Sequence, residues 1–175
     1  MAIMVRQLLP VDWSVLRTIR LEALAISPDG FGSTYEEEKD RTEAEWRHVF
    51  ERESIFAAFV DGCVGGIIAL MPHQQQKYYH RGTIFSVYVS PTYRCQGIGG
   101  RLLDAVMLHA KSMGLLQIQL GVRCDNEAAI ACYTKKGFVK IGHTPRSSFT
   151  NGAFHDEQTM MVFLDGFVSK SFYAP

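Results

Sequence analysis

The sequence predicts an α/β protein with a mixed, mostly antiparallel sheet, a central parallel strand pair and helices on both faces. The segments follow the order β-α-α-β-β-β-α-β-α-β-β. A strand, a helix and a second strand succeed one another near the centre, which implies a right-handed crossover and one parallel pair. Strands joined by short turns stand on either side of this unit and predict antiparallel hairpins.

The N-terminal part predicts one strand followed by two helices. A short strand covers residues 3–9, Asp12 offers an N-cap, and apolar residues follow at helical spacing up to residue 26. Thr42 and Glu45 have the spacing of a capping box and open the second helix. The acidic run 36–38 between the helices is interpreted as a solvated surface.

The central part predicts three strands and a long helix. The strands 55–60 and 64–70 flank Asp61-Gly62, a pair that supplies the positive φ angles of a two-residue hairpin turn. A β-branched and aromatic strand follows over 83–89, and an amphipathic helix follows over 98–113.

The C-terminal part predicts three strands and a short helix. Apolar and polar residues alternate over 116–122, and a helix with acid at its start and lysines at its end covers 127–136. The last two strands, 138–141 and 154–164, are expected to be separated by a loop that contains Asn151-Gly152.

Length, charge and cysteine content limit the classes of protein. A chain of 175 residues suits one domain, expected over 1–165, with a C-terminal tail over 166–175. Eighteen basic residues balance eighteen acidic ones, which argues against a nucleic-acid partner and an anionic membrane surface. No signal peptide or membrane span is recognised, and the four cysteines lack metal-ligand spacing, so a cytoplasmic protein without a metal is expected.

A glycine-rich turn joins the strand that ends at Val89 to the next helix. Glycines let the backbone approach a ligand closely, and the amides of a helix's first turn favour an anion such as a phosphate or pyrophosphate. A Walker-type loop is excluded, because Arg101-Leu102 stands where Lys and Ser or Thr are needed. A dinucleotide-binding loop is excluded as well, because Leu102 replaces the third glycine and no acidic residue stands near Gln119.

Two blocks resemble the Gcn5-related N-acetyltransferase (GNAT) superfamily. Arg94, Gly97 and Gly99 match its Arg-x-x-Gly-x-Gly signature. The segment 126–138 matches its Asn-x-x-Ala-x-x-x-Tyr-x-x-x-Gly-Phe pattern, in the right order and with one helix and one strand between the blocks. The early Arg-Leu-Glu-Ala-Leu helix at 20–24 extends the resemblance over the whole domain.

This resemblance implies acetyl-CoA as the acyl donor. The backbone of Val87 and Val89 should bind the pantetheine arm as an added strand does, and the Val89 N–H should polarise the thioester carbonyl. The amides of 95–100 should hold the pyrophosphate, and Asn126 matches a position that contacts the arm. The positions assigned to the cofactor are Val87, Tyr88, Val89, Arg94, Cys95, Gln96, Gly97, Ile98, Gly99, Gly100 and Asn126.

The resemblance also implies catalytic roles. Tyr133 matches the tyrosine that protonates the departing thiolate, and the alternative is a helix tyrosine packed beside Phe138. An attacking amine must also lose a proton. Several family members carry a carboxylate where this chain has Phe85 and Ser86, and the ribosomal-protein alanine acetyltransferases carry a Glu where it has Gly121.

Another residue must therefore handle the amine. Glu22 is the first candidate, because its helix and the following loop normally wall the acceptor site, although a solvated residue near Arg20 is the alternative. Asp156 and Glu157, at the beginning of the last strand, are further candidates, although a surface role is the alternative.

The function expected is transfer of an acetyl group from acetyl-CoA to a primary amine by direct attack in a ternary complex, with a small-molecule acceptor favoured. The alternatives are a non-catalytic acyl-CoA-binding sensor and a protein N-terminal acetyltransferase. Homodimers are common in the family, and the late strands would be able to support one. The acceptor itself stays open.

Overall fold

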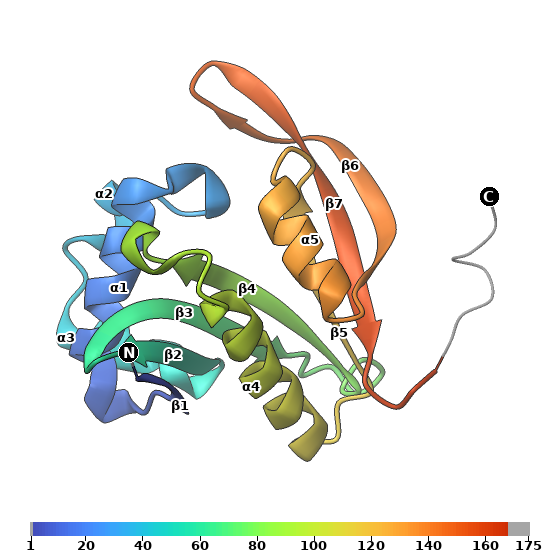
Figure 1. Ribbon diagram of the computed structural model, residues 1–175, viewed down its shortest axis with the longest axis horizontal. Coiled ribbons are helices and arrows are strands. Elements are labelled where there is room, and N and C mark those ends of the chain that lie inside the picture. The colour runs from blue at the N-terminus through green and yellow to red at the C-terminus, as the bar shows by residue number, and fades with distance from the viewer. Residues whose placement is uncertain (1, 168–175) are drawn as a thin grey trace. The chain divides into compact units, whose positions relative to one another are not determined.

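The computed structural model describes residues 2–167, and Figure 1 shows the arrangement of its elements. The strands are β1 (Ile3–Gln7), β2 (Ser54–Val60), β3 (Cys63–Pro72), β4 (Arg81–Val89), β5 (Gln117–Arg123), β6 (Val139–Thr150) and β7 (Ala153–Phe163). The helices are α1 (Trp13–Ile26), α2 (Tyr35–Glu38), α3 (Glu43–His48), α4 (Ile98–Ser112) and α5 (Glu127–Lys135). Most of the tail expected over 166–175 lies outside the described residues.

The seven strands form one mixed sheet with the order β1-β2-β3-β4-β5-β7-β6. β4 and β5 are the parallel pair, in register from Arg81–Gln117 to Thr83–Gln119. The pairings β1–β2, β2–β3, β5–β7 and β6–β7 are antiparallel. The predicted fold class, with its central strand–helix–strand crossover, is confirmed.

Two compact units make up the chain. The first contains Met1–Met71 and Phe85–Leu108, and the second contains Pro72–Ile84 and His109–Pro175. β4 therefore begins in the second unit and ends in the first. The assignment of 1–165 to a single domain stays a prediction.

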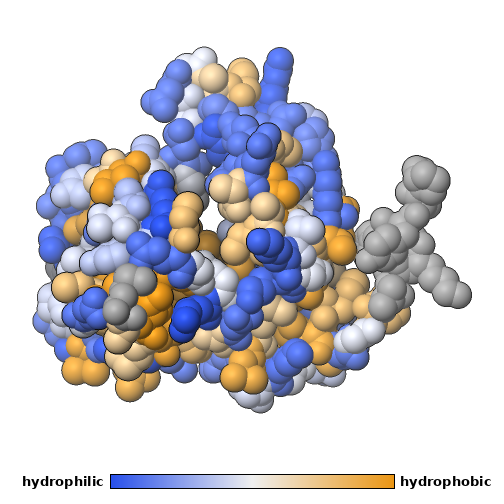
Figure 2. All heavy atoms as spheres, in the orientation of Figure 1, coloured by the Kyte–Doolittle hydropathy of each residue, from blue (hydrophilic) through white to orange (hydrophobic). Residues whose placement is uncertain are grey.

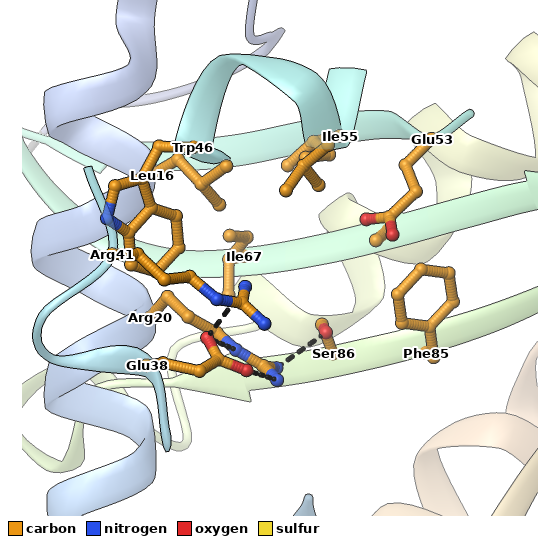
Figure 3. A pocket seen from close by; sticks show the side chains of 12 residues that line it. Leu16, Arg20, Glu38, Arg41, Trp46, Glu53, Ile55, Ile67, Phe85 and Ser86 are labelled. Atoms are coloured by element: carbon orange, nitrogen blue, oxygen red, sulfur yellow. Dashed lines mark hydrogen bonds and ion pairs between the residues drawn. The ribbon is translucent and has the colours of Figure 1, made fainter. Parts of the chain in front are cut away.

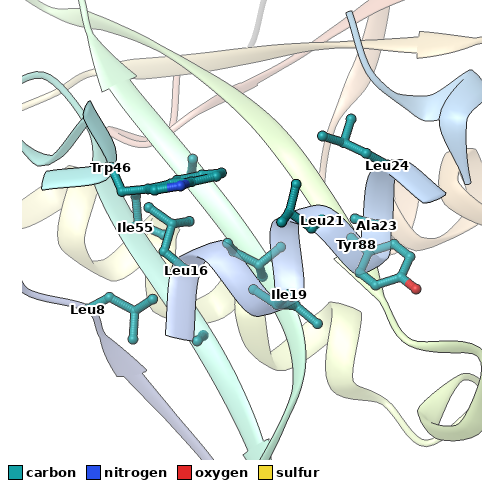
Figure 4. Packing of buried hydrophobic residues seen from close by; sticks show 12 residues of the cluster. Leu8, Leu16, Ile19, Leu21, Ala23, Leu24, Trp46, Ile55 and Tyr88 are labelled. Carbon is teal, nitrogen blue, oxygen red and sulfur yellow. The ribbon is translucent and has the colours of Figure 1, made fainter. Parts of the chain in front are cut away.

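The core of the first unit lies between α1 and one face of its strands (Figure 4). Leu16, Ile19 and Leu24 of α1 are buried at helical spacing, and Trp46 of α3 packs against the same cluster. The strand residues that complete this cluster are Ile55 and Ala57 of β2, Ile67 and Ala69 of β3, and Tyr88 of β4. Burial of a side chain of this size stabilises the fold by about 1.5–3 kcal/mol, so the apolar stripe of α1 holds the helix in place.

The opposite face of the same strands carries α4. A Cβ atom at Gly66 of β3 would stand 3.2 Å from Leu102 Cδ1 and 3.3 Å from Ile98 Cγ2, both on α4. Neighbouring residues of a strand point to opposite faces, so Ile67 reaches the α1 cluster while Gly66 meets α4. Helices therefore cover both faces of the sheet within the first unit.

The second unit contains the β5–β7–β6 ladder and α5. Leu120 and Val122 of β5 and Met160 of β7 are buried, and Phe138 after α5 is 1% exposed. β6 and β7 form a long hairpin whose turn is Asn151-Gly152, with φ angles of 52° and 78°. The loop predicted between two short strands is wrong, because residues 142–144 and 148–150 are paired to β7 despite their polar sequence.

Local signals in the N-terminal part are confirmed in two places and corrected in two. Thr42 caps α3, and Asp61 with Gly62 forms the β2–β3 turn at φ angles of 47° and 87°. Asp12 stands at the start of α1 but makes no side-chain cap, because its carboxylate pairs with Arg6 at 2.8 Å. The acidic run 36–38, interpreted as solvated, forms most of α2 and buries Glu38 to 2% exposure.

Hydrophilic and hydrophobic side chains are mixed on the face shown in Figure 2. Exposed large hydrophobic residues come from many elements, among them Leu9, Tyr79 and Leu108. No helix in the part of the chain that the structure describes has the length and apolarity of a membrane-spanning helix.

Candidate active site

The end of β4 and the start of α4 are joined by an exposed loop within the first unit. Cys95 and Gly97 have left-handed φ angles of 60° and 78°, which turn the chain sharply before Ile98 begins the helix. A Cβ atom at Gly97 would meet nothing within 4 Å, so this backbone faces open space. The first amides of a helix lack intrahelical acceptors, and this loop therefore fits an anionic ligand.

Arg94 fixes the beginning of this loop. Its Nε donates to the carbonyl of Val89 at 3.0 Å, and its Nη2 donates to the hydroxyl of Ser27, just after α1, at 3.2 Å. The side chain is exposed, so its charge also stands in solvent near the loop amides. The arginine of the signature thus shapes the loop and contributes positive charge to it.

Gly65 and Gly66 of β3 pack closely against the end of β4 and the start of the loop, a role that was not predicted from the sequence. The carbonyl of Gly65 accepts from the Ser90 amide at 2.9 Å. A Cβ at Gly65 would lie 2.5 Å from Cδ2 of Tyr93, and one at Gly66 would lie 3.0 Å from the Tyr88 carbonyl oxygen. Two adjacent glycines inside a strand were the available signal, since they indicate a close backbone approach.

Glu22 of α1 lies against the end of β4. Its Oε1 accepts a hydrogen bond from the Tyr88 hydroxyl at 2.9 Å and another from the Ser90 hydroxyl. Burial and the hydrogen bond to Glu22 raise the pKa of Tyr88 to about 12, so this hydroxyl keeps its proton. The structure therefore places Glu22 beside two residues of the candidate cofactor strand.

A buried ion pair lies next to this region (Figure 3). Arg20 Nη2 and Nε bind the two carboxylate oxygens of Glu38 at 2.9 and 3.1 Å, and Arg20 Nη1 donates to the Ser86 hydroxyl at 2.7 Å. Burial would raise the pKa of Glu38, but hydrogen bonds from Arg20 and Ser33 hold it below its usual value. Ser86 has a φ of 53° inside β4, a conformation that costs about 1–2 kcal/mol and that the bond from Arg20 helps to hold.

The ion pair borders a cavity of about 220 Å³ in the first unit. Glu53, immediately before β2, lines this cavity together with Phe85 and Ser86 of β4. Burial raises the pKa of Glu53 to about 7, although Arg20 and Arg41 lower it. Glu53 was not predicted as a site residue, because nothing in the chain around it indicates that its carboxylate lines a cavity.

The second unit carries the other two predicted site residues. Asn126 caps α5, with its side-chain oxygen accepting from the Ala129 amide at 3.1 Å. Tyr133 is 6% exposed and its ring centroid lies 5.9 Å from that of Phe138. Burial raises the pKa of Tyr133, so the hydroxyl is a proton donor at neutral pH. The packing against Phe138 and a role as an acid are compatible with one another.

Position 121 of the second unit is filled by a carboxylate from another strand. A Cβ at Gly121 of β5 would lie 2.6 Å from Oε1 of Glu157, which belongs to the neighbouring strand β7. Glu157 therefore covers the place where a longer side chain at position 121 would begin. Asp156 points to a different set of partners, the Arg146 amide and His143.

Within residues 2–167, no group of three or more His, Cys, Asp or Glu side chains has the arrangement of a metal site. The first unit brings Glu22, Tyr88 and Ser90 into hydrogen-bonding contact and carries the exposed loop. Asn126 and Tyr133 belong to the second unit.

Known proteins resemble this chain in sequence and in fold. The model of the family described as "Acetyltransferase (GNAT) family" matches residues 17–138, which is more than half of the chain. The chain belongs to the GNAT family. The match contains both sequence blocks, Glu22 and Tyr133, and it ends before Glu157.

Curated relatives of this GNAT chain are longer than the matched part. Mycothiol acetyltransferase of Catenulispora acidiphila is 27% identical over 132 residues, 74% of this chain and 41% of the relative. Spermidine N(1)-acetyltransferase of Escherichia coli is 28% identical over 119 residues, 67% of this chain and 62% of the relative. The matches therefore span less than two thirds of either relative.

A solved structure shows the same fold. The GNAT chain superimposes with a TM-score of 0.81 on a Salmonella typhimurium structure described with its cofactor acetyl-CoA. The two are 18% identical, and the match covers 97% of this chain and 98% of the other. At this identity the likeness establishes the fold.

Proposed function

We propose that the protein transfers an acetyl group from acetyl-CoA to a primary amine of a small molecule, by direct attack in a ternary complex. The observation that carries this proposal is the exposed loop over 94–97 between β4 and α4, in a chain that belongs to the GNAT family. Its amides and its open glycine suit the pyrophosphate of a coenzyme A ester.

The donor site needs little basic charge under this proposal. The chain has a formal net charge of zero, and the negative charge of the donor is met by backbone amides, a helix N-terminus and Arg94. Val87 and Val89 lie past the last residue pair of the β4–β5 register, Thr83 with Gln119. The Val89 carbonyl accepts from Arg94, so the Val89 amide and the peptide groups of Val87 are the groups proposed to pair with the pantetheine arm as a strand would.

The chemistry requires a donor for the oxyanion and an acid for the thiolate. The Val89 amide supplies the hydrogen bond to the thioester carbonyl, where negative charge develops as the amine attacks. Tyr133 supplies the proton to the coenzyme A thiolate, and the raised pKa of its buried hydroxyl means that it holds this proton at neutral pH.

On the amine side, Glu22 is the first candidate for a contact to the acceptor. One of its oxygens already accepts two hydroxyl hydrogen bonds, which favours a positioning role in which the other oxygen meets the amine. Glu157 is the second candidate, because its carboxylate stands over Gly121 and can accept a proton there. Glu22→Gln and Glu157→Gln, measured separately, decide between them by the loss of kcat/KM with the donor KM unchanged.

The relatives support a small-molecule acceptor, since their names refer to mycothiol and to spermidine. The absence of a glutamate at Gly121 separates this chain from the pattern of the ribosomal-protein alanine acetyltransferases. The alternative from a different class is an acyl-CoA-binding module without turnover.

The deciding experiment measures thiol release from acetyl-CoA with a panel of amines, together with calorimetric binding of coenzyme A. Turnover with at least one amine supports the proposal, whereas tight coenzyme A binding without turnover supports the binding module. Tyr133→Phe should lower kcat by about 100-fold and leave coenzyme A binding unchanged. Tyr79→Phe, at a residue 68% exposed in the Pro72–Arg81 loop, is the matched control.

We also propose a cytoplasmic location and a homodimer, with neither nucleic acid nor membrane as a partner. The balanced charge of the chain supports the last two points. Light scattering of the purified protein tests the dimer, and fractionation of cells tests the location.

A further inference from the structure

The cavity of the first unit has charged groups with unused binding capacity on its wall. It is lined by α1, α2, α3 and the strands β2, β3 and β4, and its volume is about 220 Å³. This is smaller than the pockets that hold drug-sized ligands, and it suits a ligand of few atoms. The charged side chains on its wall are Arg20, Glu38, Arg41 and Glu53.

Two of these four groups, Arg20 and Glu38, bind one another. Arg20 makes two hydrogen bonds to Glu38 and two more to the hydroxyls of Ser33 and Ser86. The side chains of Arg20 and Glu38 are 14% and 3% exposed. This pair is therefore part of the wall and has little capacity left for a ligand.

Arg41 has donors to spare. Its guanidinium makes one long ion pair, 3.5 Å from Nη1 to a Glu38 oxygen that Arg20 also binds, and it lies 5.4 Å from the ring centroid of Trp46. The side chain is 36% exposed, so solvent and ligands can reach it. In Figure 3 the guanidinium points from the α2 side toward the middle of the cavity.

Glu53 has acceptors to spare. Its carboxylate makes no hydrogen bond and no ion pair with any residue in 2–167, and Figure 3 shows it beside Phe85 at the other side of the cavity from Arg41. A half-buried carboxylate loses hydration, and here no hydrogen bond from a described residue replaces it. A bound cation would supply that partner.

We propose that this cavity binds a small zwitterion, an amino acid or a compound with the same pair of charges, whose carboxylate pairs with Arg41 and whose ammonium group pairs with Glu53. One cation and one anion with unused hydrogen-bonding capacity match such a ligand in charge, and the apolar side chains of Leu16, Ile55 and Ile67 leave room for its body. Arginine is suited to a carboxylate, since two of its N–H groups can bind both oxygens.

The role of this ligand as the acetyl acceptor rests on the proposed function. Phe85 and Ser86 line the cavity, and Val87, the next residue of the same strand, belongs to the proposed path of the pantetheine arm. In this arrangement Glu53, in place of Glu22 or Glu157, accepts a proton from the ammonium group, and the free amine attacks the thioester carbon. A C–N bond forms and the C–S bond breaks, and the thiolate takes the proton of Tyr133. The nitrogen then loses a second proton, and this proton restores the Tyr133 hydroxyl.

Ionised Glu53 is needed to bind the ammonium group, which gives the site a pH dependence. The groups that face Glu53 are Arg20 and Arg41, which favour its ionised form, and Glu38, which opposes it. With the pKa of Glu53 near 7, the affinity for the zwitterion should fall as the pH is lowered from 8 to 6.

The test compares matched ligands on the 175-residue protein by calorimetry with coenzyme A present, and by thiol release from acetyl-CoA. Each set holds an amino acid, its amide and the amine without the carboxyl group, for example leucine, leucinamide and 3-methylbutylamine, with phenylalanine and lysine sets alongside. The zwitterion of at least one set should bind about 10- to 100-fold more tightly than its two analogues. Arg41→Gln should abolish that preference, and Glu53→Gln should weaken binding of the zwitterion by a similar factor.

Two exposed residues provide matched controls. Arg47→Gln and Glu51→Gln remove the same charges from side chains that are 42% and 68% exposed and that do not line the cavity, and both should bind as the wild type does. Arg41→Lys and Glu53→Asp keep the charges and should retain part of the affinity, which separates a lost charge from a lost fold.

The outcomes distinguish this inference from the proposed function. Equal binding of all three ligands in every set, or cavity variants that match their controls, overturns the zwitterion site even if the enzyme acetylates simple amines. Binding of a zwitterion that depends on Arg41 and Glu53, without any thiol release, supports the site and overturns the transfer reaction.

Discussion

Removal of Glu38 should be among the most destabilising single changes in the first unit. The Glu38 side chain is 3% exposed and accepts hydrogen bonds from Arg20 Nε and Nη2 at 3.1 and 2.9 Å and from the Ser33 hydroxyl at 2.5 Å. Glu38→Ala leaves the guanidinium of Arg20, itself 14% exposed, without its anion. Breaking a buried pair from one side costs about 3–5 kcal/mol.

The measurement is equilibrium unfolding in urea at pH 7, followed by circular dichroism. A loss of about 3–5 kcal/mol corresponds to a fall in Tm of roughly 6–20 °C for a chain of this size. Glu36→Ala is the control, since Glu36 lies on the same helix, is 74% exposed and pairs only with Lys39 in the described part of the chain. Its effect should be within about 0.5 kcal/mol.

The pH dependence gives an independent check of the same reasoning. Because hydrogen bonds from Arg20 and Ser33 outweigh burial and lower the pKa of Glu38, the pair stabilises the fold above the usual carboxyl range. That contribution is lost as the pH falls through the lowered pKa of the folded state. Glu38→Gln should therefore be less stable than the wild type at pH 7 and approach it in acid. A cost for Glu38→Ala below about 1 kcal/mol, or equal to that of Glu36→Ala, would refute the argument.

Three further changes test other parts of the structure. Glu53→Gln should be more stable than the wild type by about 2 kcal/mol above pH 7 and equal to it near pH 4. The reason is that the raised pKa of Glu53 makes its ionised form unfavourable in the folded state, and urea unfolding at both pH values checks this. Gly65→Ala should cost about 1–3 kcal/mol and weaken coenzyme A binding in calorimetry, since the new methyl group would stand 2.5 Å from Tyr93, whereas Gly32→Ala meets nothing and should do neither. Asn126→Ala should lower the free energy of unfolding by about 1 kcal/mol by removing the cap of α5, and no change would show that this cap contributes little.

Short-range signals predicted most of the elements correctly. The capping box of Thr42 and Glu45 and the Asp61-Gly62 turn each act within four residues, so they are visible in the chain itself. The segment 142–150 was not predicted as a strand, because residues 142–144 and 148–150 are held by pairing with β7, a partner that periodicity does not show.

One part of the candidate site was predicted from the sequence and another part was not. The loop over 94–97 was predicted from its glycines and is found exposed and turned by Cys95 and Gly97. The cavity was not predicted, because Glu38 and Glu53 are ordinary acidic residues in the sequence. They differ only through what surrounds them, since Glu38 forms a close ion pair with Arg20, whereas Glu53 lines a cavity and forms no ion pair with a described residue.

The sequence by itself determined the order of the elements, the GNAT resemblance and the loop for an anionic donor, because periodicity, turns and motifs depend on residues close together in the chain. Only the tertiary structure decided which charged side chains bind one another and which keep binding capacity for a ligand. Arg20 and Glu38 are 18 residues apart, and Gly121 and Glu157 come from different strands, so their contacts exist only after folding. A charged group's role depends on its hydration and its partners, and both are set by packing.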